Sequence, residues 1–269
     1  MTGALSSVGD VLRLPLALSM AVQCLGWAVA VTSTSLRHFD LFGALTFFAV
    51  VVSLPNPSAA PSLMVIAWCC RLGSFLSLRS LRHGEDPRFN GVLHNPLKQA
   101  VVWLLQGIWV VVCLLPVILR AYRDQAAGAG AGAGPATATA TFAPTALFLA
   151  GFALEVTADY QKYVFKSDPA NAKETIRTGV WSDVRYPNYA GEIVIWLAIA
   201  LAATADLAPG IPTATDLALS YLSPIFVAFL LICVSGIPPQ EARRRQTRGD
   251  NEDDDDDDDP RARLIPRIY

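Results

Sequence analysis

Residues Thr178–Trp196, TGVWSDVRYPNYAGEIVIW, place a polar segment directly before an apolar helix that we expect from Ile193 to about Ala203. The twelve positions from Trp181 to Glu192 hold tryptophan, arginine, tyrosine, asparagine and glutamate side chains. Ionisable groups at the mouth of a membrane helix are costly to keep, and by default they are candidates for a functional site. Trp, Tyr and Arg also flank many membrane helices as interfacial anchors, so the pattern alone leaves both interpretations open.

The composition indicates a polytopic membrane protein. Of 269 residues, 53% are hydrophobic and 16% are charged, against about 25% charged residues in an average globular domain. Several apolar runs are long enough to cross a bilayer, which takes roughly 20 residues. The basic residues are scattered among the loops, which argues against nucleic-acid binding. The five cysteines lie in apolar runs without metal-ligand spacing to a histidine, so we expect no metal site.

We predict an all-α fold, a membrane helix bundle of about seven transmembrane helices in a single domain. The predicted spans are residues 14–32, 41–54, 62–78, 99–119, 144–165, 193–205 and 217–234. Between the fourth and fifth spans, residues 120–141 include the alternating Gly128–Gly134 run, which is typical of a flexible linker. This run fails the glycine spacing of the dinucleotide fingerprint, and no strand precedes it, which excludes a Rossmann fold.

The same pattern divides the chain into three parts and gives it an orientation. We expect N-terminal membrane helices over residues 1–60, a membrane core over 61–240 and a tail over 241–269, whose seven aspartates at 253–259 should be disordered. With seven spans, the segments on one side of the membrane carry 17 Lys and Arg residues and those on the other side carry three. The positive-inside rule therefore predicts an integral multi-pass protein with a cytosolic C-terminus.

The polar segment also resembles a signature of the steroid 5α-reductase-like membrane reductases and of their uncharacterised relatives. Those proteins carry a block close to G-x-W-x-x-S-R-H-P-N-Y-x-G-E before an apolar helix, and Gly179–Glu192 follows it with Tyr186 in place of the usual histidine. The terminal LIPRIY, Leu264–Tyr269, resembles the ending of the 5α-reductases. Related membrane methyltransferases share a shorter Arg-His-Pro-x-Tyr-x-Gly version of the block.

The resemblance implies a membrane-embedded NADPH-dependent reductase of a carbon–carbon double bond in a sterol or another lipid, located in the endoplasmic reticulum. It implies a cofactor cavity among the C-terminal helices of the core. The matching cofactor-binding positions are Asp159, Lys162, Trp181, Arg185 and Asn188. We add Lys166 and Arg177, because a polyanionic dinucleotide needs several cations. Tyr189 and Glu192 are the candidate catalytic residues, and either of them could polarise a substrate carbonyl or hold the nicotinamide.

Two other functions remain alternatives. The first is an S-adenosylmethionine-dependent membrane methyltransferase of the isoprenylcysteine or phospholipid type. Such relatives usually add a paired-glutamate motif after the last span, whereas this chain has Ser-Gly-Ile-Pro there and the single Glu241, which argues against methyl transfer. The second is a non-catalytic membrane homologue, supported by a tail that has no Tyr or His between Glu241 and Leu264. The lipid substrate and the oligomeric state are left open.

Overall fold

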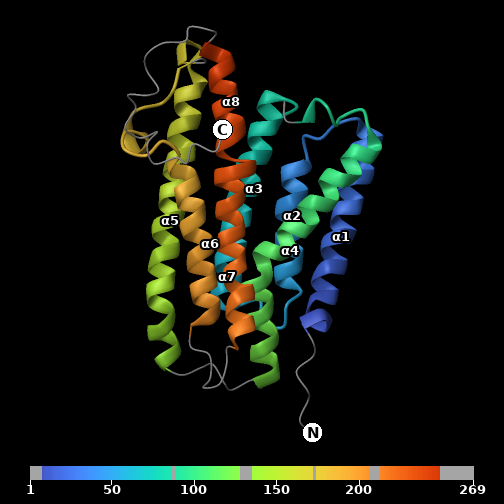
Figure 1. The fold of residues 1–269 in the computed structure, drawn as a ribbon, viewed down its shortest axis with the longest axis vertical. Coiled ribbons are helices and arrows are strands. Elements are labelled where there is room, and N and C mark those ends of the chain that lie inside the picture. Colours follow the sequence, from blue (N-terminus) through green and yellow to red (C-terminus); the bar gives the residue numbers. More distant parts are fainter. Residues whose placement is uncertain (1–7, 87–88, 128–134, 172–173, 206–212, 249–269) are drawn as a thin grey trace. The chain divides into compact units, whose positions relative to one another are not determined.

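The protein is an integral membrane protein made of helices. Its computed structural model describes residues 8–86, 89–127, 135–171, 174–205 and 213–248. These described residues form helices and no strand (Figure 1), which confirms the predicted all-α fold. Six helices are long and apolar enough to cross a membrane, and a seventh apolar helix, Phe39–Val52, has 14 residues. The predicted bundle of about seven membrane helices is therefore confirmed.

Eight helices follow one another along the described residues. They are α1 Val8–Ser33, α2 Phe39–Val52, α3 Ala60–His83, α4 Pro96–Ala127, α5 Pro135–Ser167, α6 Pro187–Thr204, α7 Ala214–Phe229 and α8 Ile237–Arg248. Single 3-10 turns occupy Pro169–Asn171 and Gly179–Trp181, and a π-helical turn, Leu230–Val234, extends α7. Both α4 and α6 begin at a proline, whose missing N–H is not needed in the first turn of a helix.

The predicted linker between the fourth and fifth spans is shorter than expected. Helix α4 continues to Ala127 and α5 begins at Pro135, so the described parts of residues 120–141 are helical. Alanine is the commonest residue in these flanks, six of 15, and its high helix propensity favours extension of both helices beyond their apolar runs. The Gly128–Gly134 run itself lies outside the described residues.

Two further boundaries differ from the prediction near the polar segment. Helix α6 begins at Pro187 and not near Ile193, so the asparagine, tyrosine and glutamate of the NYAGE sequence lie on its first two turns. Helix α8 runs through residue 240 to Arg248, across the predicted start of the tail. The aspartate run and the terminal hexapeptide lie outside the described residues.

The helices divide into two compact units. Unit 1 comprises Met1–Pro144 and Ile199–Ser223, and unit 2 comprises Thr145–Ala198 and Pro224–Tyr269. Helices α5, α6 and α7 each contribute one part to each unit. The predicted division of the chain at residues 60 and 240 stays a prediction.

Unit 1 is held by packing of α1 against α4 and α2, and of α2 against α3. Trp103 of α4 is 1% exposed, and its ring lies directly over Gly26 of α1, where no side chain could fit. Its ring centroid is 4.9 Å from that of Phe39 on α2. Deeper in the unit, Gln23 Nε2 donates to Thr46 Oγ1 at 2.7 Å, which joins α1 to α2 with a buried hydrogen bond of the kind that stabilises membrane helix pairs.

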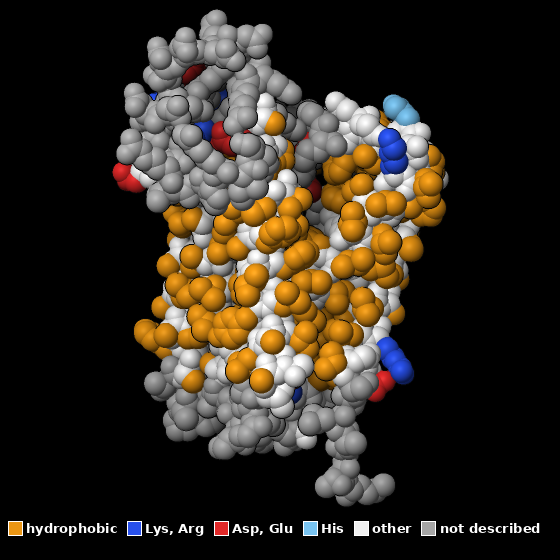
Figure 2. All heavy atoms as spheres, viewed as in Figure 1, with side chains coloured by type: hydrophobic (Ala, Val, Ile, Leu, Met, Phe, Trp, Pro, Cys, Tyr) orange, Lys and Arg blue, Asp and Glu red, His pale blue; other side chains and the backbone are white. Residues whose placement is uncertain are grey.

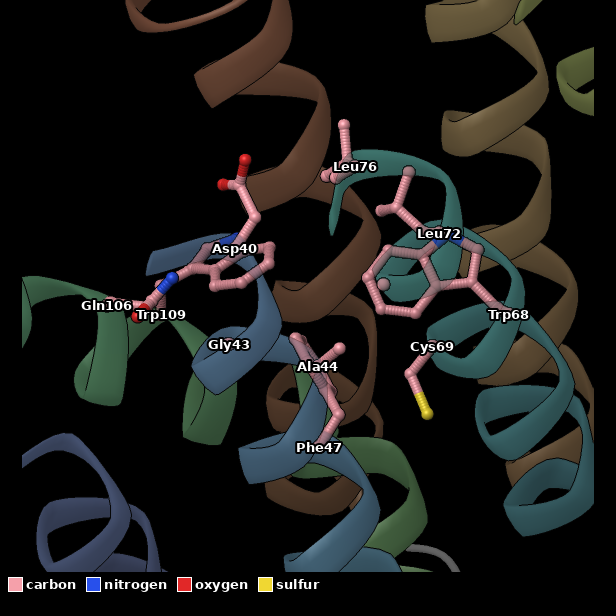
Figure 3. A pocket seen from close by; sticks show the side chains of 11 residues that line it. Asp40, Gly43, Ala44, Phe47, Trp68, Cys69, Leu72, Leu76, Gln106 and Trp109 are labelled. Atoms are coloured by element: carbon pink, nitrogen blue, oxygen red, sulfur yellow. The ribbon is translucent and has the colours of Figure 1, made fainter. Parts of the chain in front are cut away.

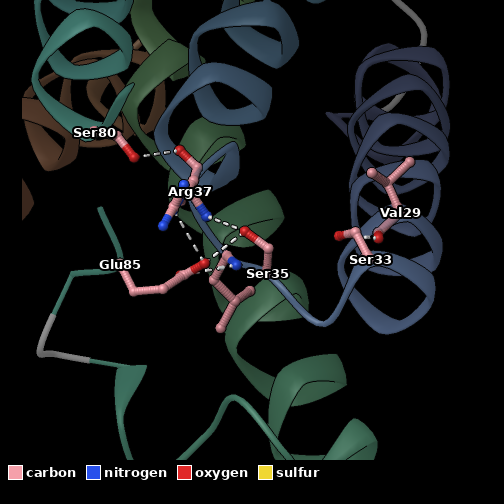
Figure 4. A network of polar contacts seen from close by, with 7 residues as sticks. Val29, Ser33, Ser35, Arg37, Ser80 and Glu85 are labelled. Atoms are coloured by element: carbon pink, nitrogen blue, oxygen red, sulfur yellow. Dashed lines mark hydrogen bonds and ion pairs between the residues drawn. The ribbon is translucent and has the colours of Figure 1, made fainter. Parts of the chain in front are cut away.

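Glu85 organises the loops at one end of unit 1 (Figure 4). Its carboxylate accepts hydrogen bonds from Ser35 Oγ at 2.5 Å and from the Leu36 backbone N–H at 3.1 Å. Arg37 Nε lies 3.5 Å from the same carboxylate, and Ser80 Oγ of α3 donates to the Arg37 carbonyl at 2.9 Å. One acidic residue after α3 therefore fixes the loop between α1 and α2.

Two buried arginines stabilise the other end of unit 1. Arg120 and Arg123 of α4 are each 9% exposed. Arg120 Nη1 donates to the carbonyl of Ala205, just beyond the end of α6, at 2.8 Å, where a cation also offsets the negative end of the helix dipole. Arg123 Nη2 lies 2.5 Å from Asp216 Oδ1 in the first turn of α7. These contacts join α4 to the C-terminus of α6 and the N-terminus of α7.

Breaking the Arg123–Asp216 pair should destabilise the protein. The Arg123 side chain is 9% exposed and that of Asp216 is 19% exposed, and removing one partner of a buried pair leaves a charge without compensation. We expect Arg123→Met to lower the free energy of unfolding by about 2–4 kcal/mol, measured by denaturant titration in detergent micelles. Arg13→Met is the matched control, because its pair with Asp10 is 81% and 41% exposed and should contribute about 0–0.5 kcal/mol. Equal losses for the two variants would contradict this account.

Unit 2 depends on a close approach of α5 and α6. A Cβ atom added to Gly191 would lie 2.8 Å from the Gly151 carbonyl oxygen and 2.9 Å from the Glu155 backbone nitrogen. A Cβ atom on Gly151 would lie 2.9 Å from the Gly191 carbonyl oxygen. Small residues allow membrane helices to approach backbone to backbone, where packing and not hydrophobicity drives association.

A side chain at this crossing should separate the two helices. We expect Gly191→Ala to lower the free energy of unfolding by about 1–3 kcal/mol, the usual effect of overpacking, despite the better helix propensity of alanine. Gly91→Ala is the control, because a Cβ atom there meets no atom within 4 Å. Denaturant titration of both variants in the same detergent compares them, and a stable Gly191→Ala protein would exclude a tight crossing.

The surface of the helices suits a bilayer. Figure 2 shows hydrophobic side chains over most of the visible helix surface, with the coloured charged side chains near the helix ends. Large exposed apolar residues occur on helices of both units: Leu25, Leu104, Leu105, Leu149, Ile225 and Phe229. Such surfaces are unfavourable in water and favourable against lipid tails, which supports a membrane environment.

Candidate functional site

A polar cluster lies at one end of unit 2. It joins the end of α5, the segment before α6, the first turns of α6 and the start of α8. Its members are Asp159, Lys162, Trp181, Arg185, Tyr186, Asn188, Tyr189, Gln240 and Glu241. Six of the nine residues that the sequence predicts for the site belong to it. Segments up to 82 residues apart in the chain therefore bring most of the predicted residues together.

Trp181 anchors the segment between α5 and α6. A 3-10 turn begins at Gly179, whose φ of 62° favours glycine, and carries the indole into the unit. The indole is 1% exposed, and its Nε1 donates to the Ala158 carbonyl at 3.0 Å. Gln161 Oε1 accepts a hydrogen bond from the Val180 backbone N–H at 3.0 Å. The Trp181 ring also lies 5.3 Å from Lys162 Nζ, within cation–π distance.

Asp159 fixes the orientation of the Asn188 side chain. Asn188 Nδ2 donates to Asp159 Oδ1 at 3.2 Å. A carboxylate accepts and cannot donate, so this contact sets which end of the amide faces α5. The other end, Asn188 Oδ1, is buried and accepts no hydrogen bond from the described residues. Because a buried acceptor without a donor is costly, this oxygen is the natural point for a ligand N–H or O–H group.

A hydrogen-bonded chain connects α5, α8 and α6. Lys162 Nζ donates to Gln240 Oε1 at 2.8 Å, and Gln240 Nε2 donates to the Tyr189 hydroxyl. The Tyr189 hydroxyl in turn lies 3.4 Å from the Gly236 carbonyl oxygen, a long and weak contact for its own proton. Gln240 thus brings the Lys162 amine and the Tyr189 phenol to the two ends of a single amide.

Arg185 and Tyr186 converge on Glu241. Arg185 Nη2 lies 2.9 Å from Glu241 Oε2, and the Tyr186 hydroxyl donates to Glu241 Oε1. Arg185 is 5% exposed and Tyr186 is 4% exposed. The Tyr186 and Tyr189 rings stack with centroids 5.6 Å apart and planes 16° apart. The tyrosine that replaces the usual histidine is therefore a buried donor to a carboxylate of α8.

The other three predicted residues are Lys166, Arg177 and Glu192. Lys166 is exposed and donates to the backbone carbonyls of Asn171 and Glu174, so it holds the loop after α5. Arg177 is exposed on the same loop. Glu192 is half-buried on α6, one turn beyond Asn188. The cofactor-binding roles of Lys166 and Arg177 and the catalytic role of Glu192 stay predictions.

Sequence reasoning missed Gln161, Gln240 and Glu241 as members or supports of the site. Gln161 shares the α5 face with Ala158, so its helical spacing gave a signal. Glu241 is the first carboxylate after the last span and precedes a run of arginines, which is also visible in the sequence. Only the fold shows that Gln240 of α8 contacts α5 and α6, and that Glu241 contacts the two residues just before α6.

Unit 1 contains a small cavity of about 50 Å³ among α2, α3 and α4 (Figure 3). Phe47, Trp68 and Trp109 supply aromatic walls, and Asp40 and Gln106 supply the polar groups. Ligand pockets usually measure about 300–1,000 Å³, so this cavity takes a small group and not a whole lipid. It has no lining residue in common with the polar cluster of unit 2.

Comparisons with known proteins give one family. The family described as "Protein of unknown function (DUF1295)" matches residues 26–255, which is most of the chain. The chain belongs to this family. DUF1295 is a membrane family related to the steroid 5α-reductases, so the predicted resemblance is confirmed at that level. No curated protein and no solved structure matches the chain.

The DUF1295 match includes every residue of the polar cluster. Substitution of Trp181 tests whether this residue anchors the cluster. We expect Trp181→Phe to lower the free energy of unfolding by about 1–3 kcal/mol, because the Ala158 carbonyl loses a buried donor. Trp27→Phe is the control: Trp27 Nε1 also donates to a backbone carbonyl, that of Pro96, at 3.1 Å but in an exposed place. Thermal unfolding in detergent should show the larger effect at Trp181, and the reverse order would contradict its role as the anchor.

Proposed function

We propose that this protein is a membrane-embedded NADPH-dependent reductase of a carbon–carbon double bond in a sterol or another lipid. The polar cluster of unit 2 would form its cofactor site. The observation that carries the proposal is the Asn188 amide, because Asp159 holds its Nδ2 and leaves a buried acceptor, Oδ1, without a donor among the described residues. A carboxamide N–H, such as that of nicotinamide, would satisfy this acceptor.

The other members of the cluster fit the charges of a dinucleotide phosphate. Arg185 and Lys162 supply buried or half-buried cations on the same end of unit 2. Arginine binds phosphate with planar, paired donors, and lysine binds it as a point charge. The Trp181 indole is buried beside Lys162 and holds this segment in place. Together with the Asn188 acceptor, these cations therefore suit a ligand that combines phosphates with a carboxamide.

The chain's own residues would handle the proton. When bound, NADPH supplies a hydride to one carbon of the double bond, and a proton added to the other carbon completes the reduction. Tyr189 is the first candidate proton donor, and the contact of its hydroxyl with the Gly236 carbonyl is long and weak. The Gln240 donor on the same oxygen stabilises the phenolate that remains after proton transfer. Glu192 remains the second candidate at this step.

The family relationship and the membrane helices support the lipid substrate class. A bilayer supplies sterols and other lipids directly to a protein with exposed apolar helices. Location in the endoplasmic reticulum with a cytosolic C-terminus would give the cluster access to NADPH, and the distribution of Lys and Arg supports that orientation. Methyl transfer from S-adenosylmethionine is the rival function, and the same experiment tests it.

Ligand binding to the purified full-length protein in detergent tests the proposal. NADPH and S-adenosylmethionine are titrated separately while thermal unfolding is followed. A ligand at 100 times its dissociation constant adds about 2.7 kcal/mol to stability, so we expect a clear rise with NADPH and none with S-adenosylmethionine. The Asn188→Ala, Glu192→Ala double variant should lose the NADPH effect.

Two results would contradict the proposal. A rise with S-adenosylmethionine alone would indicate methyl transfer, and no rise with either ligand would indicate a non-catalytic membrane protein. Asn90→Ala is the matched control, because Asn90 is exposed in a loop of unit 1. It should keep the full response to NADPH.

A further inference from the structure

We propose that Glu241 occupies an anion-binding site formed by Arg185 and Tyr186, and that a phosphoryl group of the bound ligand displaces it. The inference deepens the proposed function, and it rests on that function as far as the phosphoryl group belongs to NADPH. It gives α8 a role in controlling ligand affinity.

The donors of this site belong to the buried framework of unit 2. Arg185 and Tyr186 are 5% and 4% exposed and lie directly before Pro187, the first residue of α6. Their guanidinium and phenol groups converge on one carboxylate. Such a pair of donors, one charged and one neutral, is equally suited to the oxygens of a phosphoryl group.

The carboxylate that accepts from these donors belongs to Glu241, which is more exposed than they are. The Glu241 side chain is 16% exposed, three times as much as that of Arg185. Leaving a buried guanidinium without an anion costs several kcal/mol, so the protein must supply one whenever no ligand does. Glu241 satisfies this need from α8, a different element from the one that carries the donors.

The preceding residue of α8 behaves in the same way. Gln240 contacts both Lys162 and Tyr189, so two consecutive residues engage two of the predicted cofactor-binding cations and one predicted catalytic tyrosine. A single turn of α8 therefore contacts three of the residues that the proposed function assigns to the ligand: Lys162, Arg185 and Tyr189. These contacts and the ligand's contacts exclude one another at Arg185.

The connection before α8 departs from regular helix geometry, and the proposed displacement requires this turn to move. Helix α7 ends in the π-helical turn Leu230–Val234, and Ser235 and Gly236 follow before α8 begins at Ile237. The backbone N–H groups of Ser235 and Gly236 both point to the Leu230 carbonyl. π-Helical turns interrupt the regular hydrogen bonding of a helix and occur mostly at functional sites.

The energetic consequence is a reduced apparent affinity for the ligand. If the ligand binds only where Glu241 has left Arg185, the measured dissociation constant is the intrinsic constant divided by the fraction of molecules in that state. Removing the carboxylate should raise this fraction toward one. Glu241→Gln keeps the size of the side chain and removes its charge, which makes it the decisive variant.

The experiment measures dissociation constants by calorimetry for the full-length protein in detergent, with two probes. NADPH tests the whole ligand, and inorganic pyrophosphate tests the phosphoryl chemistry alone. We expect Glu241→Gln to bind both probes roughly tenfold more tightly than the unmodified protein, and to melt at a lower temperature without ligand. Arg185→Gln should weaken binding of both. Glu174→Gln, which removes an exposed carboxylate from the same unit, should leave both constants unchanged.

The outcomes separate this inference from the proposed function. Tighter pyrophosphate binding by Glu241→Gln, without NADPH binding by any variant, would support the displaced carboxylate and overturn the reductase. NADPH binding that is unchanged or weaker in Glu241→Gln would overturn the inference and leave the reductase standing. Absence of binding by either probe in every variant would overturn both. If Glu241→Gln does not fold, Glu241→Asp retracts the carboxylate by one methylene and should tighten binding severalfold, and unchanged binding would overturn the inference.

Discussion

The close approach of α5 and α6 at Gly151 and Gly191 is the constraint on which unit 2 depends. In lipid, helices gain nothing from hiding apolar surface from one another, so association relies on packing and on polar contacts. The antiparallel helices advance in opposite directions from this crossing. Glu155 therefore meets Gly191, and one turn farther along α5, Asp159 meets Asn188. The position of Asn188 against α5 therefore depends on the close crossing at Gly151 and Gly191.

The polar cluster shows how a membrane protein can retain several charges at one helix end. Its cations do not stand alone: Lys162 has an amide and an indole, and Arg185 has a carboxylate. Each arrangement lowers the cost of removing a charge from water. In the proposed function, the same cations would exchange these internal partners for those of an anionic ligand. Helix α8 supplies two of these partners, Gln240 for Lys162 and Glu241 for Arg185.

Much of the architecture could be predicted from the sequence, because a bilayer admits few solutions. The spans were found from apolar length, since every backbone polar group in lipid must be bonded within its own helix. The predicted helix boundaries that were wrong lie where helix propensity, and not the length of the apolar run, decides where a helix begins or ends. Alanine-rich flanks lengthened α4 and α5, and Pro187 started α6 ahead of its apolar run. The resemblance also pointed to the correct family, and six of the nine predicted site residues lie in one cluster.

The sequence by itself determined the membrane class, the helical fold and the segment that carries most of the polar cluster. These depend on local composition and on short motifs, which a single chain displays directly. Only the tertiary structure decided that Gln240 and Glu241 belong with Lys162, Tyr189 and Arg185. Likewise, Lys166 looked equivalent to Lys162 in the sequence but holds a loop. Partners in the cluster are separated by up to 78 residues, and such pairings depend on how helices cross, which periodicity and composition do not encode.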